Sequence, residues 1–66
     1  MVVTANGKVV VLDDGATVAD LLATMGLTGR VVAVEHNHRA LLRSEQGATN
    51  LAEGDTIEIV RAVAGG

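Results

Sequence analysis

The sequence contains no cysteine and no aromatic residue among its 66 positions. Without cysteine there is no disulfide and no Cys-ligated metal, so a domain this small depends on its hydrophobic core alone. That core must be built from Val, Leu, Ile, Ala and Met, in line with a hydrophobic content of 48%. The chain also has no aromatic ring on which a nucleic-acid base could stack.

Positive charge and long apolar runs are scarce as well. Five Lys and Arg residues are scattered along a chain of net charge -3, so a nucleic-acid surface is not expected. No apolar stretch is long enough to span a membrane, and the N-terminus lacks the pattern of a signal peptide. We therefore expect a cytoplasmic protein that binds neither nucleic acid nor membrane.

Sequence motifs for catalysis are missing too. Ser44 is the only serine, and no base can be paired with it to make a nucleophile. There is no phosphate-binding loop of the Gly-x-x-x-x-Gly-Lys type. We expect that the chain is not an enzyme and binds no cofactor itself.

An N-terminal β-hairpin is predicted by two apolar, β-branched runs at residues 1–5 and 8–12. Asn6-Gly7 separates them, and this dipeptide suits a type I′ turn, which needs positive φ at both central positions. Two aspartates and a glycine at 13–15 then end the second strand.

A helix is predicted to begin after Thr17. Thr17 and Asp20 have the spacing of a capping box, in which each side chain binds the backbone amide of the other residue. Gly26 fits the left-handed position that ends a helix. One apolar face is formed by residues that recur at i, i+3, i+4 and i+7, namely Val18, Leu21, Leu22 and Met25.

Three β-rich runs follow the helix and are predicted as strands, at residues 30–35, 39–43 and 56–63. Polar segments separate them, with turns at 36–37 and 53–55 and a loop at 44–50. Leu51 is expected to anchor that loop to the core. The apolar run from Val31 to Val34 indicates a strand buried on both faces.

The predicted order is therefore β-β-α-β-β-β within one domain spanning residues 1–66. A single helix on one face of a sheet buries both apolar surfaces in two layers, which is an α+β architecture. The order is similar to that of the β-grasp, or ubiquitin-like, fold, with a mixed sheet of four to five strands. That similarity implies a last strand that pairs in parallel with the first.

The chain ends in Gly65-Gly66, shortly after the last predicted strand. Glycine can enter a channel too narrow for any other residue, which leaves the terminal carboxylate of Gly66 as the reactive group of the tail. Residues 62–66 are expected to be flexible, because a terminal diglycine has no side chain to anchor it. Such a tail indicates a substrate or carrier for other enzymes.

Over nearly its whole length the sequence resembles the ThiS family, the sulfur carriers of the thiamine pathway. The segments that carry the resemblance are the Asn6-Gly7 hairpin and residues 14–22, 32–37, 43–45, 51–60 and 62–66. Family members often have a proline before the Arg-Ser pair and an aromatic residue soon after it. This chain has Leu42 and Gln46 near those places.

The resemblance implies a defined chemistry for Gly66. A ThiF/MoeB-like adenylating enzyme would use ATP to activate the Gly66 carboxylate. A persulfide donor would supply the sulfur, since the chain has no cysteine, and would leave a thiocarboxylate on Gly66. A ThiG-like thiazole synthase would then accept that sulfur.

The residues just before the diglycine are candidates for recognition of the tail. The adenylating partner must hold the tail, and its candidate contacts are Arg61, Val63, Ala64 and Gly65. For Arg61, a solvated strand charge explains the sequence equally well.

A second candidate surface lies on the last predicted strand. If the isoleucines at 57 and 59 face the core, the alternate residues Glu58, Val60 and Ala62 face solvent on the way to the tail. This exposed set is either a docking surface for a partner or simple exposure at the edge of a sheet.

His36 and His38 alternate, so both could face one side of an extended segment. That spacing is compatible with a metal pair, but no further ligand cluster supports one. Two surface imidazoles beside a turn are the preferred interpretation, and no metal site is predicted.

Three other functions are compatible with the sequence. The same sulfur chemistry could serve another acceptor, such as molybdopterin or cysteine biosynthesis. The chain could also be a ubiquitin-like binding module with an inert tail. A third option is a protein modifier joined to lysines through Gly66.

Overall fold

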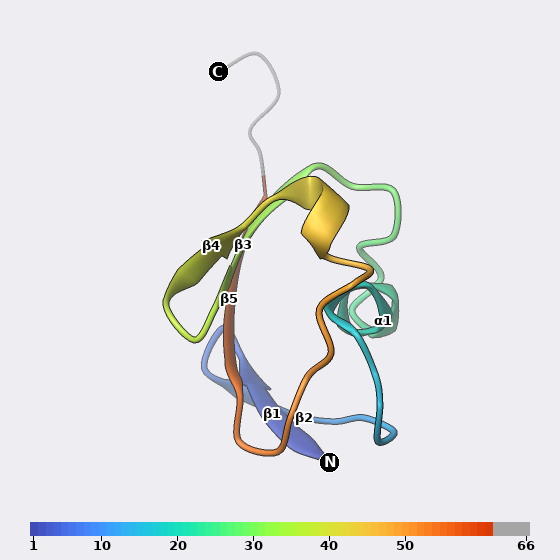
Figure 1. Ribbon diagram of the computed structural model, residues 1–66, viewed down its shortest axis with the longest axis vertical. Helices are drawn as coiled ribbons and strands as arrows, with labels where there is room; N and C mark the ends of the chain where they lie inside the picture. The colour runs from blue at the N-terminus through green and yellow to red at the C-terminus, as the bar shows by residue number, and fades with distance from the viewer. Residues whose placement is uncertain (62–66) are drawn as a thin grey trace.

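The computed structural model describes residues 1–61, and the predicted tail at 62–66 lies outside this range. Its elements in chain order are β1 (Val2–Ala5), β2 (Lys8–Val11), α1 (Val18–Thr24), β3 (Val32–His36), β4 (Arg39–Leu41), the 3₁₀ helix η1 (Arg43–Glu45) and β5 (Thr56–Arg61). Helix α1 covers one face of a five-stranded sheet (Figure 1). None of the helices within residues 1–61 has the length and apolar character needed to cross a membrane.

Strand β5 lies at the centre of the sheet, whose order is β2-β1-β5-β3-β4. It pairs in parallel with β1, with Thr4 opposite Thr56, and antiparallel with β3, with Val34 opposite Ile59. Both outer pairs, β1 with β2 and β3 with β4, are antiparallel hairpins. The parallel pairing of the first and last strands, which the β-grasp resemblance implies, and the expected mixed sheet of four to five strands are therefore confirmed.

The predicted turn of the first hairpin and the predicted cap and end of the helix are confirmed. Asn6 and Gly7 have φ values of 51° and 79°, as a type I′ turn requires. The backbone N–H of Thr17 donates to Oδ2 of Asp20 at 2.9 Å, and the N–H of Asp20 donates to Oγ1 of Thr17 at 3.2 Å. Gly26 follows the helix at a φ of 74°.

The hydrophobic core lies between α1 and the sheet. Its largest fully buried side chains come from the helix and from β1, β3 and β5: Leu21, Ile57, Val3, Val18 and Val34. Leu51, the predicted anchor of the loop before β5, is buried in the same cluster. Within residues 1–61, the buried cluster consists of Val, Leu, Ile and Ala, and Met1 and Met25 pack against it.

The prediction that the run from Val31 to Val34 is buried on both faces is wrong. Val34 is 2% exposed, but Val31 is 60% exposed and Ala33 is also exposed. The reason is that α1 covers one face of the sheet, so burial alternates along β3. Strand β3 also continues to His36, which moves the turn to Asn37 and His38, both with positive φ.

The predicted strand at 39–43 is shorter in the structure, where β4 ends at Leu41. The backbone N–H of Leu42 donates to Oε1 of Glu45 at 2.7 Å, and the chain turns there into η1. The expected loop at 44–50 therefore begins within a helical turn. The last predicted strand, at 56–63, is described as far as Arg61.

Asp55 ties the start of β5 to the end of β3. Its Oδ2 accepts hydrogen bonds from the backbone N–H of Ala52 at 2.8 Å and from Nε2 of His36 at 2.7 Å, and its Oδ1 accepts one from the Asn37 amide at 3.0 Å. Partial burial raises the pKa of Asp55. The hydrogen bonds from His36, Asn37 and Ala52 together outweigh burial, so the pKa lies below its ordinary value of 3.8.

This lowered pKa predicts a loss of stability in acid. A carboxyl group whose pKa is lower in the folded state contributes stability that is fully present above its unfolded pKa and is lost as the pH falls through the folded value. The free energy of unfolding should therefore decrease as the pH is lowered below about 4, and it should decrease less steeply in Asp55→Asn. Urea denaturation across this pH range measures the slope. Asp13→Asn, at an exposed position, is the control, and identical slopes for Asp55→Asn and the unchanged protein would contradict the assignment.

Candidate functional site

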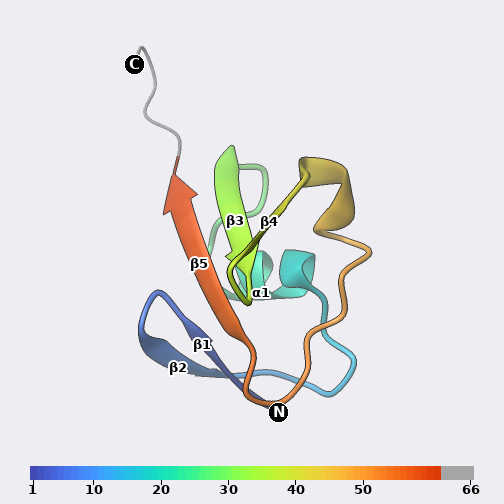
Figure 2. The same cartoon turned by 60° about the vertical axis from the view of Figure 1, so that its left-hand side comes forward.

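The candidate site is the C-terminal end of β5, the part of the described chain that leads to the diglycine. On one side β5 pairs with β3 as far as Arg61, which lies opposite Val32. On the other side the backbone pairing with β1 ends at Ile57. In Figure 2, β5 extends past the turn that joins β1 and β2, so that its C-terminal end is flanked by β3.

From Ile57 to Val60 the side chains of β5 alternate between the core and the solvent, and Arg61 is exposed as well. Ile57 and Ile59 are buried, whereas Glu58, Val60 and Arg61 are exposed, Val60 to 66%. The predicted orientation of Glu58 and Val60 is therefore confirmed, and their role in docking stays a prediction. Gly66 and the other tail candidates, Ala62, Val63, Ala64 and Gly65, lie outside the described residues.

Two glutamates lie directly opposite each other on the exposed face of the sheet. Glu58 of β5 is the register partner of Glu35 of β3, and both are exposed. Like charges placed opposite each other in neighbouring strands destabilise a sheet. Val60 and its partner Ala33 are the next pair on this face, toward the tail, and both are exposed. An acidic pair and a small apolar pair thus lie side by side before the tail.

The prediction of two surface imidazoles is wrong for His36 and confirmed for His38. His36 is not a surface imidazole, because its side chain is 21% exposed and bound to Asp55. An ionised carboxylate only accepts hydrogen bonds, so Nε2 of His36 carries the proton in this contact. His38 is exposed in the turn between β3 and β4. Within residues 1–61, no group of three or more His, Cys, Asp or Glu side chains could hold a metal ion.

Sequence reasoning missed two side chains that fix β5. The sequence indicates only a turn role for Asn6, yet its side chain accepts from the Ile59 N–H at 2.7 Å and donates to the Ile59 carbonyl at 3.1 Å. Asp55 was interpreted as a turn residue, yet it also binds β3. No local pattern indicates a contact between positions 53 residues apart in the chain.

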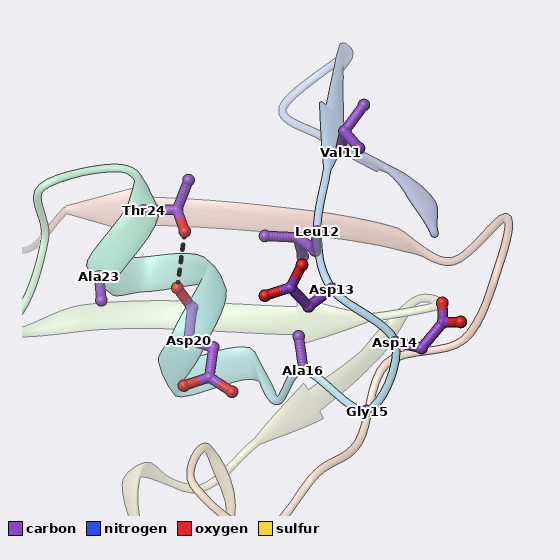
Figure 3. A pocket seen from close by; sticks show the side chains of 9 residues that line it. All are labelled: Val11, Leu12, Asp13, Asp14, Gly15, Ala16, Asp20, Ala23 and Thr24. Atoms are coloured by element: carbon purple, nitrogen blue, oxygen red, sulfur yellow. Dashed lines mark hydrogen bonds between the residues drawn. The ribbon is translucent and has the colours of Figure 1, made fainter.

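An open groove of about 560 Å³ lies beside α1 (Figure 3). Its walls come from the end of β2, the segment after it and the helix, with Asp13, Asp14 and Asp20 among them. The Asp20 carboxylate accepts a hydrogen bond in the helix cap. The backbone carbonyl of Asp20 accepts one from the Thr24 hydroxyl at 3.1 Å. No residue of β5 lines this groove, so it is separate from the candidate site.

The fold and the strand that leads to the diglycine define a β-grasp, or ubiquitin-like, protein. The ThiS family matches this chain over residues 2–66. The sulfur carrier protein ThiS of Bacillus subtilis (strain 168) is 39% identical over 53 residues, which are 80% of each chain. The chain belongs to the ThiS family, and the predicted family and fold are confirmed.

Solved structures agree with this assignment. The crystal structure of the thiamine biosynthesis protein ThiS from Geobacter metallireducens is 32% identical, with a TM-score of 0.81 over 100% of both chains. A solution structure of a thiamine biosynthesis protein from the same organism has a TM-score of 0.78 at 32% identity. It matches 100% of this chain and 88% of its own length.

The opposed glutamates lead to a prediction about stability. Glu58→Gln should raise the free energy of unfolding by about 0.2–1 kcal/mol, because it removes the repulsion from Glu35. Glu35→Gln should give a similar gain, and the double variant should gain little beyond either single one. The gain should shrink at high salt, which screens exposed charges. Urea denaturation of the four proteins tests this, and additive gains or a loss of stability would contradict the proposed repulsion.

Proposed function

We propose that this protein is a cytoplasmic sulfur carrier for thiamine biosynthesis and that the carboxylate of Gly66 receives and delivers the sulfur. The ThiS-family match carries the proposal, because it extends from residue 2 to residue 66 and so includes both terminal glycines. The protein would then be a substrate of its partners and would perform no catalysis of its own.

The chemistry begins with activation of a poor electrophile. A carboxylate spreads its negative charge over two oxygens and resists attack by a nucleophile. Attack of the Gly66 carboxylate on the α-phosphate of ATP releases pyrophosphate and gives an acyl adenylate. We place ATP on a ThiF/MoeB-like adenylating enzyme, since this chain has no phosphate-binding loop.

Sulfur then replaces the adenylate. The terminal sulfur of a persulfide attacks the Gly66 carbonyl and expels AMP. An external thiol then attacks the donor's sulfur in the resulting acyl disulfide, forms a disulfide with the donor and releases the thiocarboxylate of Gly66. The persulfide belongs to a partner because this chain has no cysteine. The thiocarboxylate sulfur is a nucleophile that a ThiG-like thiazole synthase would incorporate into the thiazole ring.

The exposed face of β5 and β3 supports docking of the adenylating partner next to the tail. Glu35 and Glu58 repel each other in the free protein, and a basic partner surface would relieve that repulsion. Val60 and Ala33 add apolar area beside them. We therefore propose an adenylating enzyme that presents basic side chains around a small apolar contact.

Intact-mass spectrometry tests the carrier function. After incubation with ATP, a persulfide donor, a thiol and the adenylating enzyme, the protein should gain the mass of one oxygen-to-sulfur exchange. Omission of ATP should prevent the gain, and so should deletion of Gly66. An unchanged mass in the complete reaction would refute the proposal. Isopeptide conjugates with lysines would favour a modifier, and delivery to a different synthase would favour another sulfur pathway.

Replacement of Arg61 tests whether this side chain holds the tail for adenylation. Arg61→Ala should raise the KM of the adenylating enzyme about tenfold, because arginine side chains that become buried on binding are frequent hot spots of an interface. The free energy of unfolding should change by less than about 0.5 kcal/mol, because Arg61 is exposed. Arg39→Ala, an exposed arginine of β4, is the matched control and should leave the KM unchanged. An unchanged KM for Arg61→Ala would show that Arg61 is a solvated strand charge that does not contribute to binding of the enzyme.

A further inference from the structure

The side chain of Asn6 acts as an additional residue of β1. Its amide carbonyl accepts a hydrogen bond from the backbone N–H of Ile59 at 2.7 Å, and its amide NH₂ donates to the carbonyl of Ile59 at 3.1 Å. A side-chain amide carries the same donor and acceptor as a peptide group. Asn6 therefore pairs with β5 as a strand residue would, although its own backbone has already turned away at a φ of 51°.

The geometry of the sheet explains why this contact is needed. The β1–β5 register ends with Ala5 opposite Ile57, and the last backbone contact runs from the Asn6 N–H to the Ile57 carbonyl at 2.9 Å. Successive residues of a strand direct their N–H and C=O to alternate sides, so Ile59 directs both groups toward the β1 side. Without Asn6 these groups would lose their partners there.

A second asparagine makes the same type of contact at the other end of β5. Asn37 also has positive φ, at 50°, and its side chain accepts from the Thr56 N–H at 2.8 Å and donates to Asp55 at 3.0 Å. Asparagines in the left-handed conformation thus hold both ends of β5. Asn6 binds the end that leads to the tail, and Asn37 binds the end remote from it.

We propose that Asn6 is a positioning residue for the chemistry at Gly66. It holds β5 as far as Ile59 on the flank that β1 no longer covers, so that the chain proceeds toward the tail from a fixed strand. Without this contact the partner would have to order additional residues on binding, which reduces affinity. The inference rests on the proposed function of Gly66 as the adenylated group.

The test compares Asn6→Gly with Asn37→Gly. Glycine keeps the positive φ at each turn and removes two side-chain hydrogen bonds in each case. Asn6→Gly should raise the KM of the adenylating enzyme about tenfold and leave kcat nearly unchanged, because the loss is in binding. Asn37→Gly should leave both constants unchanged at a temperature where both variants are folded by circular dichroism.

Amide hydrogen exchange provides a readout that does not depend on the proposed function. The Ile59 amide should exchange at least about tenfold faster in Asn6→Gly and should be unaffected in Asn37→Gly. Equal KM values for Asn6→Gly and the unchanged protein, or equal increases in both variants, would overturn the inference. If the unchanged protein is never adenylated, the proposed function fails instead, and faster Ile59 exchange would still show that Asn6 holds β5.

Discussion

The pairing of β5 on both of its flanks is the constraint on which the rest of the structure depends. β5 supplies two core isoleucines, joins the N-terminal hairpin to the β3–β4 hairpin, and precedes the diglycine in the chain. β1 is too short to cover its full length, so the Asn6 side chain completes the flank at Ile59. At the start of the strand, Asp55 and Asn37 complete the connection to β3. β5 is thus held by side-chain hydrogen bonds at both of its ends.

Much of the fold could be predicted because its signals are local. The Asn6-Gly7 turn, the Thr17–Asp20 capping box and the apolar face of α1 each depend on residues a few positions apart. The β-grasp resemblance supplied the parallel pairing of β1 with β5, which no local pattern encodes. The burial of β3 could not be predicted from its apolar run, because burial depends on which face of the sheet α1 covers. The contacts of Asn6 and Asp55 were missed because their partners are distant in sequence.

The candidate site, like the fold, could be predicted only in part. The alternation of Ile57, Glu58, Ile59 and Val60 was enough to predict which side chains face solvent. The opposition of Glu35 and Glu58 depends on the register between β3 and β5, which the sequence does not specify. Two like charges at that place cost stability in the free protein. Exposed Val60 is the next residue on the same face.

The central claim is that sulfur is carried on the C-terminal carboxylate of this β-grasp protein. The most direct measurement is fragmentation mass spectrometry of the whole protein, purified from cells in which thiamine synthesis is induced. Sulfur carriage on Gly66 predicts an oxygen-to-sulfur exchange in every fragment that contains Gly66 and in no fragment that lacks it. An unmodified Gly66 under these conditions, or sulfur found elsewhere in the chain, would contradict it.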